Sequence, residues 1–247
     1  PMKFIYSILI FIVCCMACKR EVIPPDEVEL GKEYYPLAIG RFVEYDIDST
    51  IYNDFTKDTE FVHREFRDEV ISDFLDGEGR FSYIIQRYTR ISSAQPWSEY
   101  LTYYATQTNF KVEVVENNLR FIKMVLPVKL NTTWKGNVYI PAASSGSEDI
   151  SWYADWDYKY KNINERFFNG VKNYDNTLEV SASIGRNGLG LEGDSTLPDV
   201  YSSFTKYREF YAKNVGLIYR ELTHWEYQPV IGFRNGFSVV FKAKNNN

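Results

Sequence analysis

The stretch that decides the fold is Tyr207-Arg208-Glu209-Phe210-Tyr211-Ala212-Lys213, followed by Asn214-Val215-Gly216 and then by residues 217–227 (LIYRELTHWEY). Two runs rich in aromatic and aliphatic residues flank a short turn, which is the pattern of a β-hairpin. Gly216 allows the tight reversal of the chain, and Leu217 begins the returning strand. The stretch therefore predicts two antiparallel strands.

The sequence on either side of this hairpin is also strand-like. Residues 110–115 and 119–128 flank Glu116-Asn117-Asn118, which predicts a second hairpin with an Asn-Asn turn. Further strands are predicted at residues 42–48, 81–90 and 237–243. Residues 54–73 are the best place for a helix, although they alternate nearly as well as they follow a helical period.

The composition agrees with a sheet. Aromatic residues make up 17% of the chain, and rings pack well on a pleated, half-buried surface. No long stretch has a period of 3.6. The predicted fold is mainly β, a single domain built on a curved antiparallel sheet or half-barrel with at most one or two helices.

The beginning of the chain has a different pattern. Lys3 precedes a run of 14 residues, 4–17, in which Ser7 is the clearly polar one. A membrane-spanning helix needs about 20 apolar residues, whereas a run of this length suits the core of a signal peptide. We therefore expect residues 1–17 to be a cleaved leader, residues 18–33 a charged tether, and residues 34–247 the folded domain.

Residues 15–18 (CMAC) resemble the lipobox of bacterial lipoproteins. The resemblance implies cleavage before Cys18 and lipidation of Cys18, with acyl chains such as palmitate on the new N-terminus. Cys15 stands where lipoboxes usually carry Leu. Two or three acyl chains would hold a protein stably on a membrane. The other cysteines lie in the leader, so no disulfide is expected to stabilise the domain.

Charge and composition argue against several kinds of function. The net charge of the chain is −5, and it becomes more negative when Lys3 is removed with the leader. No long basic run is present, so nucleic acid is not an expected partner. The histidines, His63 and His224, lack metal-binding spacing, and we expect no metal and no cofactor. Residues 188–193 fit G-x-G-x-x-G but lack the strand and helix of a dinucleotide site.

Residues 152–161 (WYADWDYKYK) are the most patterned part of the chain. On a strand, Trp156 and Tyr158 would share one face, and the charges between them the other. If the rings face outward, Trp152, Trp156 and Tyr158 form a candidate ligand-binding platform for sugars. If they face inward, they belong to the core. Asp155 and Asp157 would then be neighbours on the solvated face, and paired carboxylates are what a glycosidase requires.

Two short motifs, Asp48-Ser49-Thr50 and Asp194-Ser195-Thr196, resemble the O-glycosylation acceptor of Bacteroidota envelope proteins. The resemblance implies Ser49 and Ser195 as candidate glycosylation sites. Three phrases further resemble a loose set of Bacteroidota lipoproteins of unknown activity: residues 35–46, 131–137 and 211–221. This second resemblance implies a β-rich envelope domain and carries no activity with it.

Together these observations favour an outer-membrane lipoprotein whose domain is a non-enzymatic binding or assembly module. Its ligand would be an envelope protein, a glycan or a lipid. A hollow apolar interior would favour a lipid, an exposed aromatic row a glycan, and a filled interior with an apolar outer patch a protein. The alternative is a glycan-processing hydrolase. Lys19 follows the lipidated cysteine, which disfavours the inner membrane and leaves open which side of the outer membrane the domain faces.

Overall fold

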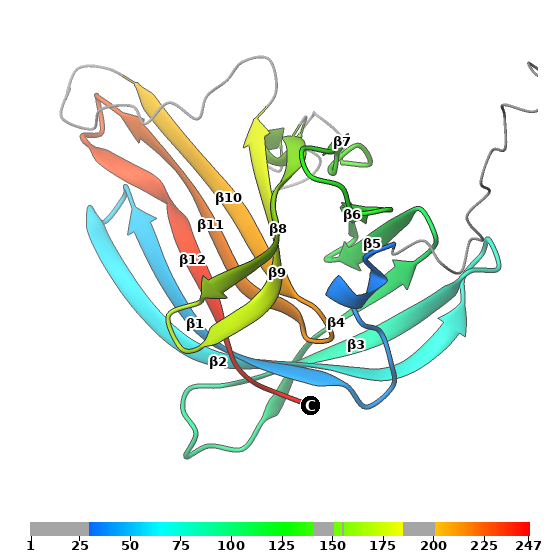
Figure 1. Cartoon of the computed structure of the whole chain (residues 1–247). Coiled ribbons are helices and arrows are strands. Elements are labelled where there is room, and N and C mark those ends of the chain that lie inside the picture. Colours follow the sequence, from blue (N-terminus) through cyan, green and yellow to red (C-terminus); the bar gives the residue numbers. More distant parts are fainter. Residues whose placement is uncertain (1–29, 141–150, 155, 185–200) are drawn as a thin grey trace, which may run out of the picture.

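The computed structural model describes residues 30–140, 151–154, 156–184 and 201–247. In these residues the chain is almost entirely antiparallel strand, with two single 3-10 turns, η2 (Lys32–Tyr34) and η3 (Ser151–Tyr153) (Figure 1). The mainly β, curved antiparallel fold is therefore confirmed. The strands are β1 Phe42–Asn53, β2 Asp58–Leu75, β3 Phe81–Arg90, β4 Ser98–Gln107, β5 Lys111–Glu116, β6 Leu119–Val125, β7 Thr133–Lys135, β8 Trp156–Phe168, β9 Asn173–Ile184, β10 Ser202–Ala212, β11 Gly216–Gln228 and β12 Phe233–Asn246.

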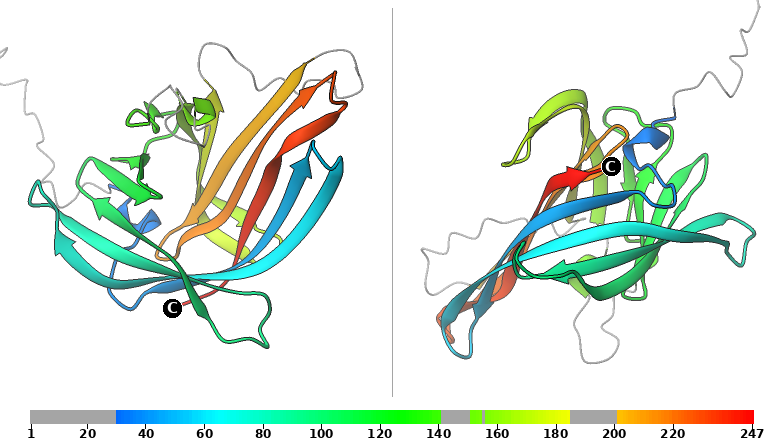
Figure 2. Two further views of the ribbon diagram at one scale, coloured as in Figure 1. Left: turned by 180° about the vertical axis from the view of Figure 1, so that it is seen from behind. Right: turned by 90° about the horizontal axis from the view of Figure 1, so that it is seen from below.

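The strands form one sheet whose order is β6-β5-β4-β3-β2-β1-β12-β11-β10-β9-β8-β7. Every strand pairs with its neighbour in the chain, except that β6 and β7 separate and β1 pairs with β12. Two six-stranded meanders are thus joined through their first and last strands. The sheet curls on itself until β6 and β7 approach each other from opposite ends (Figures 1 and 2).

Several hydrogen bonds connect β6 to β7, to β8 and to the residue that follows β7. The Ile122 amide donates to the Gly136 carbonyl at 2.7 Å. The indole Nε1 of Trp134 donates to the Ile122 carbonyl at 2.8 Å, and the Tyr160 hydroxyl donates to the Val125 carbonyl at 2.8 Å. The sheet is therefore nearly closed and barrel-like, with a seam between β6 and β7 that side chains complete.

Both predicted hairpins are confirmed. β10 and β11 pair from Ser202↔Tyr227 to Ala212↔Gly216, and Gly216 has a φ of 99° that favours glycine. β5 and β6 reverse at Asn117 and Asn118, whose φ values of 52° and 61° are those of a type I′ turn. The helix considered for residues 54–73 is wrong, because residues 54–57 form the β1–β2 turn and residues 58–73 pair with β1 and β3 as part of strand β2.

The first described residues lie within the curve of the sheet (Figures 1 and 2). Tyr34 is buried among the core rings. The side-chain amide of Gln107 donates to the carbonyls of Lys32 and Tyr35, both at 3.1 Å, and the Asn214 amide donates to the Glu33 carbonyl at 2.7 Å. The segment that precedes β1 therefore ties both meanders together at one end of the interior.

Candidate binding cavity

Several predicted site residues lie outside the described residues: Cys18, Ser195, Asp155 and the glycine-rich run 188–193. Ser49 lies in β1, half-buried, opposite Val62 on one side and Val239 on the other. Val239 packs against the core, and directly paired residues point to the same face of a sheet. Ser49 is therefore directed to the inner face of the curved sheet rather than to its outer surface.

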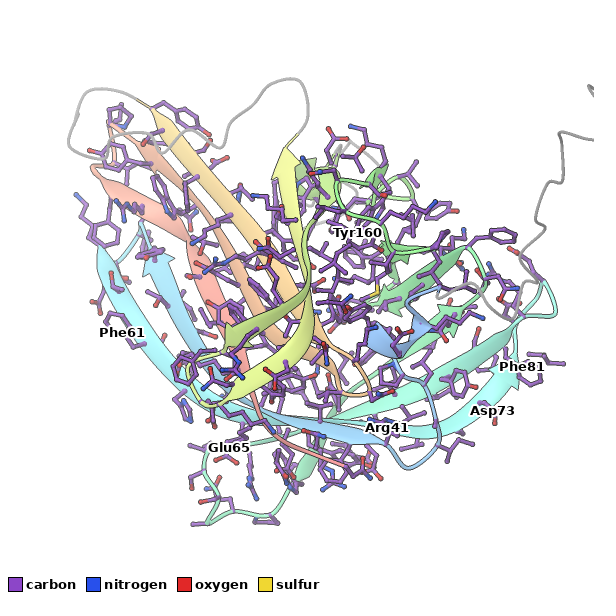
Figure 3. The ribbon with its side chains drawn as sticks, in the orientation of Figure 1. Arg41, Phe61, Glu65, Asp73, Phe81 and Tyr160 are labelled. Carbon is purple, nitrogen blue, oxygen red and sulfur yellow. The ribbon has the colours of Figure 1, made fainter. Side chains whose placement is uncertain are left out.

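The aromatic row of residues 152–161 faces inward. Trp156 and Tyr158 are each 1% exposed and belong to the main core cluster. Trp152 stacks on His224 with ring centroids 4.4 Å apart. Figure 3 shows Tyr160, which belongs to this row, inside the curve of the sheet, whereas Phe61 lies at the outer edge of the sheet. These rings form the core face that the sequence left as one of two alternatives, and Trp156 and Tyr158 offer no ring face to a sugar.

The charges between these rings lie on the outer face. Asp157 pairs with Lys135 at 3.0 Å, and both side chains are about half exposed. His63 pairs with exposed Asp48 at 2.9 Å. Within the described parts of the chain, no group of His, Cys, Asp and Glu side chains has the geometry to hold a metal ion. In the same parts, no helix is both long and apolar enough to cross a membrane.

The sequence did not reveal the charged side chains inside the sheet. Arg87 on β3 is 5% exposed. Its Nε and Nη2 donate to the two oxygens of Asp68 on β2, at 2.6 and 2.8 Å. Its Nη1 donates to Glu116 on β5 at 2.7 Å, and the Tyr103 hydroxyl donates to Asp68 at 2.9 Å. The guanidinium is thus held in fork geometry by two carboxylates.

A second ionic cluster crosses the interior from one meander to the other. Lys123 on β6 donates to Glu209 on β10 at 3.0 Å and to the Tyr207 hydroxyl at 2.6 Å. Glu209 is fully buried and also accepts from Arg220 Nε at 2.7 Å and from the Tyr211 hydroxyl at 2.6 Å. One signal in the sequence could have revealed Glu209, because it alternates with Tyr207 and Tyr211 and must share their face.

A β-bulge explains why Lys123 points inward. Val112 pairs with Met124 and Glu113 with Ile122, so Lys123 is an extra residue between two successive pairs. An extra residue interrupts the alternation of faces and redirects a side chain. Lys123 thereby reaches Glu209 across the interior.

Burial and charge set the pKa values of the second cluster. Burial alone would raise the pKa of Glu209, but the charges of Lys123 and Arg220 outweigh it and hold that pKa at about 2. Burial also lowers the pKa of Lys123, against the attraction of Glu209. Burial opposes ionisation of Glu116 as well, yet Arg87, Arg220 and Lys123 keep its pKa below the ordinary value. Glu116 and Glu209 are therefore held as carboxylates.

A cavity of about 70 Å³ opens beside the two clusters. Its charged wall includes Arg87, Lys123, Glu116 and Arg220, and Arg41 stands in the same lining and donates to the Asn214 carbonyl. Apolar side chains also line the cavity: Pro36, Leu37, Val70, Ile85, Val114 and Leu217. An engineered cavity of about 150 Å³ accommodates benzene. This cavity therefore has room for waters or for the polar end of a ligand that continues toward the opening.

Arg220 differs from the other buried arginine, Arg87, in the hydrogen bonds that its terminal nitrogens make. Nε of Arg220 binds Glu209, but neither Nη1 nor Nη2 donates a hydrogen bond to a described residue. Arg87, in contrast, uses Nε and both Nη atoms on carboxylates. Arg220 therefore offers a pair of planar donors to the cavity, which is the geometry that binds a carboxylate in two places.

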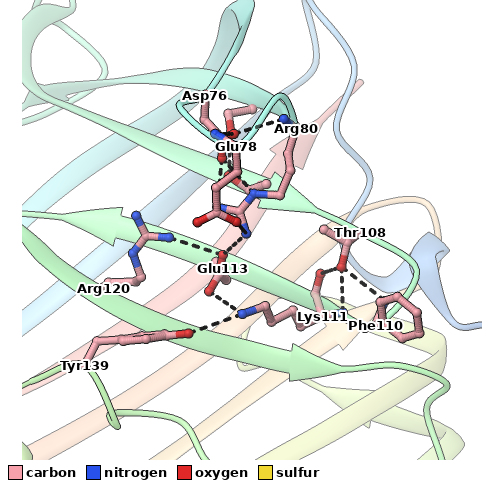
Figure 4. Close-up of polar contacts among 11 residues, drawn as sticks. Asp76, Glu78, Arg80, Thr108, Phe110, Lys111, Glu113, Arg120 and Tyr139 are labelled. Carbon is pink, nitrogen blue, oxygen red and sulfur yellow. Dashed lines mark hydrogen bonds and ion pairs between the residues drawn. The ribbon is translucent and has the colours of Figure 1, made fainter.

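A third ionic cluster lies on the outer face and is closed. Glu113 is 2% exposed and accepts from Lys111 at 2.8 Å, Arg80 at 3.0 Å and Arg120 at 3.3 Å (Figure 4). Burial opposes its charge, but these cations lower its pKa. Asp76 and Glu78 balance the cluster through Arg80. The cluster links the turn before β3 with β5 and β6.

Large apolar side chains are exposed at the ends of two neighbouring hairpins. Phe55 in the β1–β2 turn is 93% exposed and Val230 in the β11–β12 turn is 98% exposed, and Phe61 near the start of β2 is 79% exposed. Because β1 pairs with β12, the two turns lie at the same end of the sheet. Other large apolar side chains are exposed elsewhere, among them Leu75 and Phe81 beside the β2–β3 turn and Phe110 in the β4–β5 turn. Side chains fill the described interior around the cavity of about 70 Å³.

Comparisons with known proteins give a fold likeness at low identity. No family model matches the sequence, and no curated protein matches it. Among solved structures, the chain is similar to a protein of Bacteroides fragilis that has a YmcC-like fold and is assigned as an exported protein. The identity is 8% and the TM-score 0.35, over 85% of this chain and 98% of the other. A likeness of this extent carries no inference about ligand or activity.

Proposed function

We propose that this chain is an outer-membrane lipoprotein, held through acyl chains on Cys18, whose domain is a non-enzymatic binding module. Its site is the interior cavity, and its ligand carries a carboxylate on a short apolar chain. The observation that carries the proposal is that the terminal nitrogens of Arg220, whose guanidinium lies over the Phe241 ring, donate no hydrogen bond to a described residue and line a cavity that apolar side chains also line.

The charges around the cavity support an acidic ligand. Arg87, Lys123 and Arg220 are balanced by Asp68, Glu116 and Glu209. Arg41 adds a further positive charge in the lining that makes no ion pair with a described carboxylate. A ligand carboxylate beside Arg220 and Arg41 would therefore gain attraction without disturbing an existing ion pair.

The same electrostatics favour binding over hydrolysis. A glycosidase needs one carboxylic acid with a raised pKa to protonate the leaving group. The pKa values of Glu116 and Glu209 are shifted downward, against burial, by the cations that surround them. These two carboxylates are held as anions and are suited to orienting Arg87, Lys123 and Arg220.

The cavity proposal is tested by calorimetric titration of the purified full-length protein with butyrate, and with butylamine as a ligand of the same length and opposite charge. We expect butyrate to bind and butylamine not to bind. Arg220→Lys keeps the charge beside Glu209 but removes the paired terminal donors, and it should weaken butyrate binding about tenfold, the effect of losing about 1.4 kcal/mol. Arg166→Gln, at an exposed pair far along β8, should leave binding unchanged. Equal binding of the amine, or an unaltered Arg220→Lys, would contradict the proposal.

The anchor is tested separately by Cys18→Ser in cells supplied with labelled palmitate. A hydroxyl cannot form the thioether that the lipobox resemblance implies. We expect the variant to lose the label and to leave the membrane fraction, because a protein without acyl chains lacks the buried CH₂ groups that hold it there. Retention of both label and membrane association would refute lipidation at Cys18 and would leave the cavity proposal untouched.

A further inference from the structure

The interior cavity holds a tyrosine hydroxyl that no described residue binds. Tyr35 lies between η2 and β1 and lines the cavity. Its ring packs against Tyr211, with centroids 5.9 Å apart, and its main-chain carbonyl accepts a hydrogen bond from Gln107. The hydroxyl makes no hydrogen bond with a described residue, yet it is not sealed among buried atoms. It is therefore free to bind a molecule in the cavity.

The charges around this hydroxyl place it between the two interior ionic clusters. Burial raises the pKa of Tyr35 above its ordinary value, and the charges that act on it are those of Glu209 and Arg220, followed by Asp68 and Glu116. The first two belong to the cluster that crosses the interior, and the last two belong to the cluster around the other buried arginine. A neutral hydroxyl in this position can donate one hydrogen bond and accept another.

Glu116 supplies an acceptor in the same lining. Its Oε1 accepts from Arg87 at 2.7 Å, whereas its Oε2 accepts no hydrogen bond from a described residue. The surrounding cations keep the pKa of Glu116 below its ordinary value, so this oxygen belongs to a carboxylate. A partly buried carboxylate oxygen without a hydrogen bond costs free energy. The cavity therefore offers an acceptor at Glu116 beside the donors of Arg220.

The balance of charge indicates which group of a ligand would meet Glu116. The cavity lining and Glu209 together hold four cations and three carboxylates, which leaves one positive charge in excess. A ligand with one carboxylate cancels this excess. An ammonium group on the same ligand would restore it beside Arg87 and Arg220, whereas a hydroxyl donates to a carboxylate without adding charge.

We propose that the ligand of this cavity is a short hydroxy acid, whose carboxylate binds the terminal nitrogens of Arg220 and whose hydroxyl donates to Glu116 and accepts from Tyr35. This inference rests on the carboxylate site of the proposed function and adds the group that selects among carboxylates. An acid that lacks the hydroxyl leaves both side chains without this partner. A site built to bind a ligand hydroxyl discriminates against the analogue without one for that reason.

The test is calorimetric titration of the full-length protein with butyrate, 2-hydroxybutyrate, 3-hydroxybutyrate and 3-aminobutyrate. We expect at least one of the two hydroxy acids to bind about tenfold more tightly than butyrate, the effect of one hydrogen bond to a charged group. The amino acid should bind no more tightly than butyrate. If butyrate binds and neither hydroxy acid binds more tightly, or if the amino acid matches the better hydroxy acid, this inference is wrong and the carboxylate site stands. If none of the four binds, both proposals are wrong.

A single substitution then tests the role of Tyr35. Tyr35→Phe keeps the packing of the ring and removes only the hydroxyl, so the preference for the hydroxy acid over butyrate should fall about threefold or more, the effect of one neutral hydrogen bond. The affinity for butyrate should be unchanged. Because the hydroxyl has no described partner in the protein, the midpoint of thermal unfolding should not fall, as it would if the hydroxyl had a structural role.

Tyr100→Phe is the matched control, because it removes an exposed hydroxyl that does not line the cavity. It should leave the preference for the hydroxy acid unchanged. A Tyr35→Phe variant that keeps the full preference, or that loses affinity equally for butyrate and for the hydroxy acid, would overturn the assignment of Tyr35 to the ligand hydroxyl.

Discussion

Glu209 is the residue whose contacts matter most for the stability of the interior. It is fully buried, and it joins Lys123 from one meander to Arg220 from the other. Buried ion pairs are weak evidence for stability in themselves, because hydrophobic residues of similar volume often serve as well or better. Removing one partner of a buried ion pair is strongly destabilising, because the remaining charge stays buried without compensation.

We expect Glu209→Gln to destabilise the fold by about 3–5 kcal/mol, because it leaves Lys123 and Arg220 buried without their carboxylate. Denaturant unfolding measures this change, and Glu165→Gln at an exposed position on β8 should cost less than about 0.5 kcal/mol. Glu209→Gln/Lys123→Met, which also removes the buried amine, should recover part of the loss. A double variant less stable than Glu209→Gln alone would contradict this account.

The pKa of Glu209 predicts that the free energy of unfolding depends on pH in the acidic range. Its pKa in the folded state is about 2, below the ordinary value of 4.5. Its contribution is therefore present above about pH 4.5 and is lost as the pH falls from there toward 2. The shift corresponds to about 3 kcal/mol. The difference in unfolding free energy between the unaltered protein and Glu209→Gln should accordingly shrink over this window, and a difference that is constant from pH 5 to about pH 2 would refute the assignment.

The sequence predicts the positions of some of these interior residues but not of others. Alternation predicts that Trp156 and Tyr158 share one face, and both lie in the same core cluster. It did not say which face is inside, since a period of two separates the faces without orienting them. Charge alone predicts exposure, which is the usual state of Asp, Glu, Lys and Arg. The alternation of Glu209 with Tyr207 and Tyr211 is a sequence signal that the three share a face, whereas the interior position of Arg87 becomes clear from its bonds to Asp68 and Glu116.

At the scale of elements, the irregularities matter more than the regular strands. Local signals predicted the two hairpins because turn residues and flanking strands are neighbours in the chain. The bulge that turns Lys123 inward has no such signal, since it is a mismatch between two strands and not a property of one. The pairing of β1 with β12, from Val43↔Asn246 to Tyr52↔Gly236, is equally invisible because it joins the two ends of the domain.

A substitution at Gly136 tests whether the seam between β6 and β7 depends on close packing. Its carbonyl accepts the hydrogen bond from Ile122 on β6, and a Cβ at this position would lie 2.4 Å from the buried ring of Tyr158. We expect Gly136→Ala to cost about 1–3 kcal/mol through overpacking and to speed hydrogen exchange of the Ile122 amide. Gly77→Ala, where a Cβ meets nothing within 4 Å, should change stability by less than about 0.5 kcal/mol. Equal effects of the two substitutions would show that the seam does not depend on close approach at Gly136.

At the scale of the whole molecule, the nearly closed sheet is filled with tyrosine. Burial raises the pKa of Tyr153 and Tyr174 to about 12, and it shifts the pKa of seven others upward as well: Tyr35, Tyr45, Tyr103, Tyr158, Tyr160, Tyr207 and Tyr211. Each hydroxyl keeps its proton in the folded chain and loses it near pH 10 in the unfolded chain. Stability therefore falls as the pH rises above 10, because the folded state binds more protons.

The size of this effect predicts unfolding in mild alkali. At pH 11 each such tyrosine costs up to about 1.4 kcal/mol, so the nine together approach the 5–15 kcal/mol that typically holds a domain folded. The lowered pKa of Lys123 makes the folded state more stable as the pH rises, but this single group opposes nine tyrosines. We expect far-ultraviolet circular dichroism to lose the sheet signal near pH 11, in the same cooperative step in which tyrosinate absorbance appears. Tyrosinate that forms gradually while the sheet signal persists would mean that these hydroxyls reach solvent without unfolding, and the interior would then be open rather than filled.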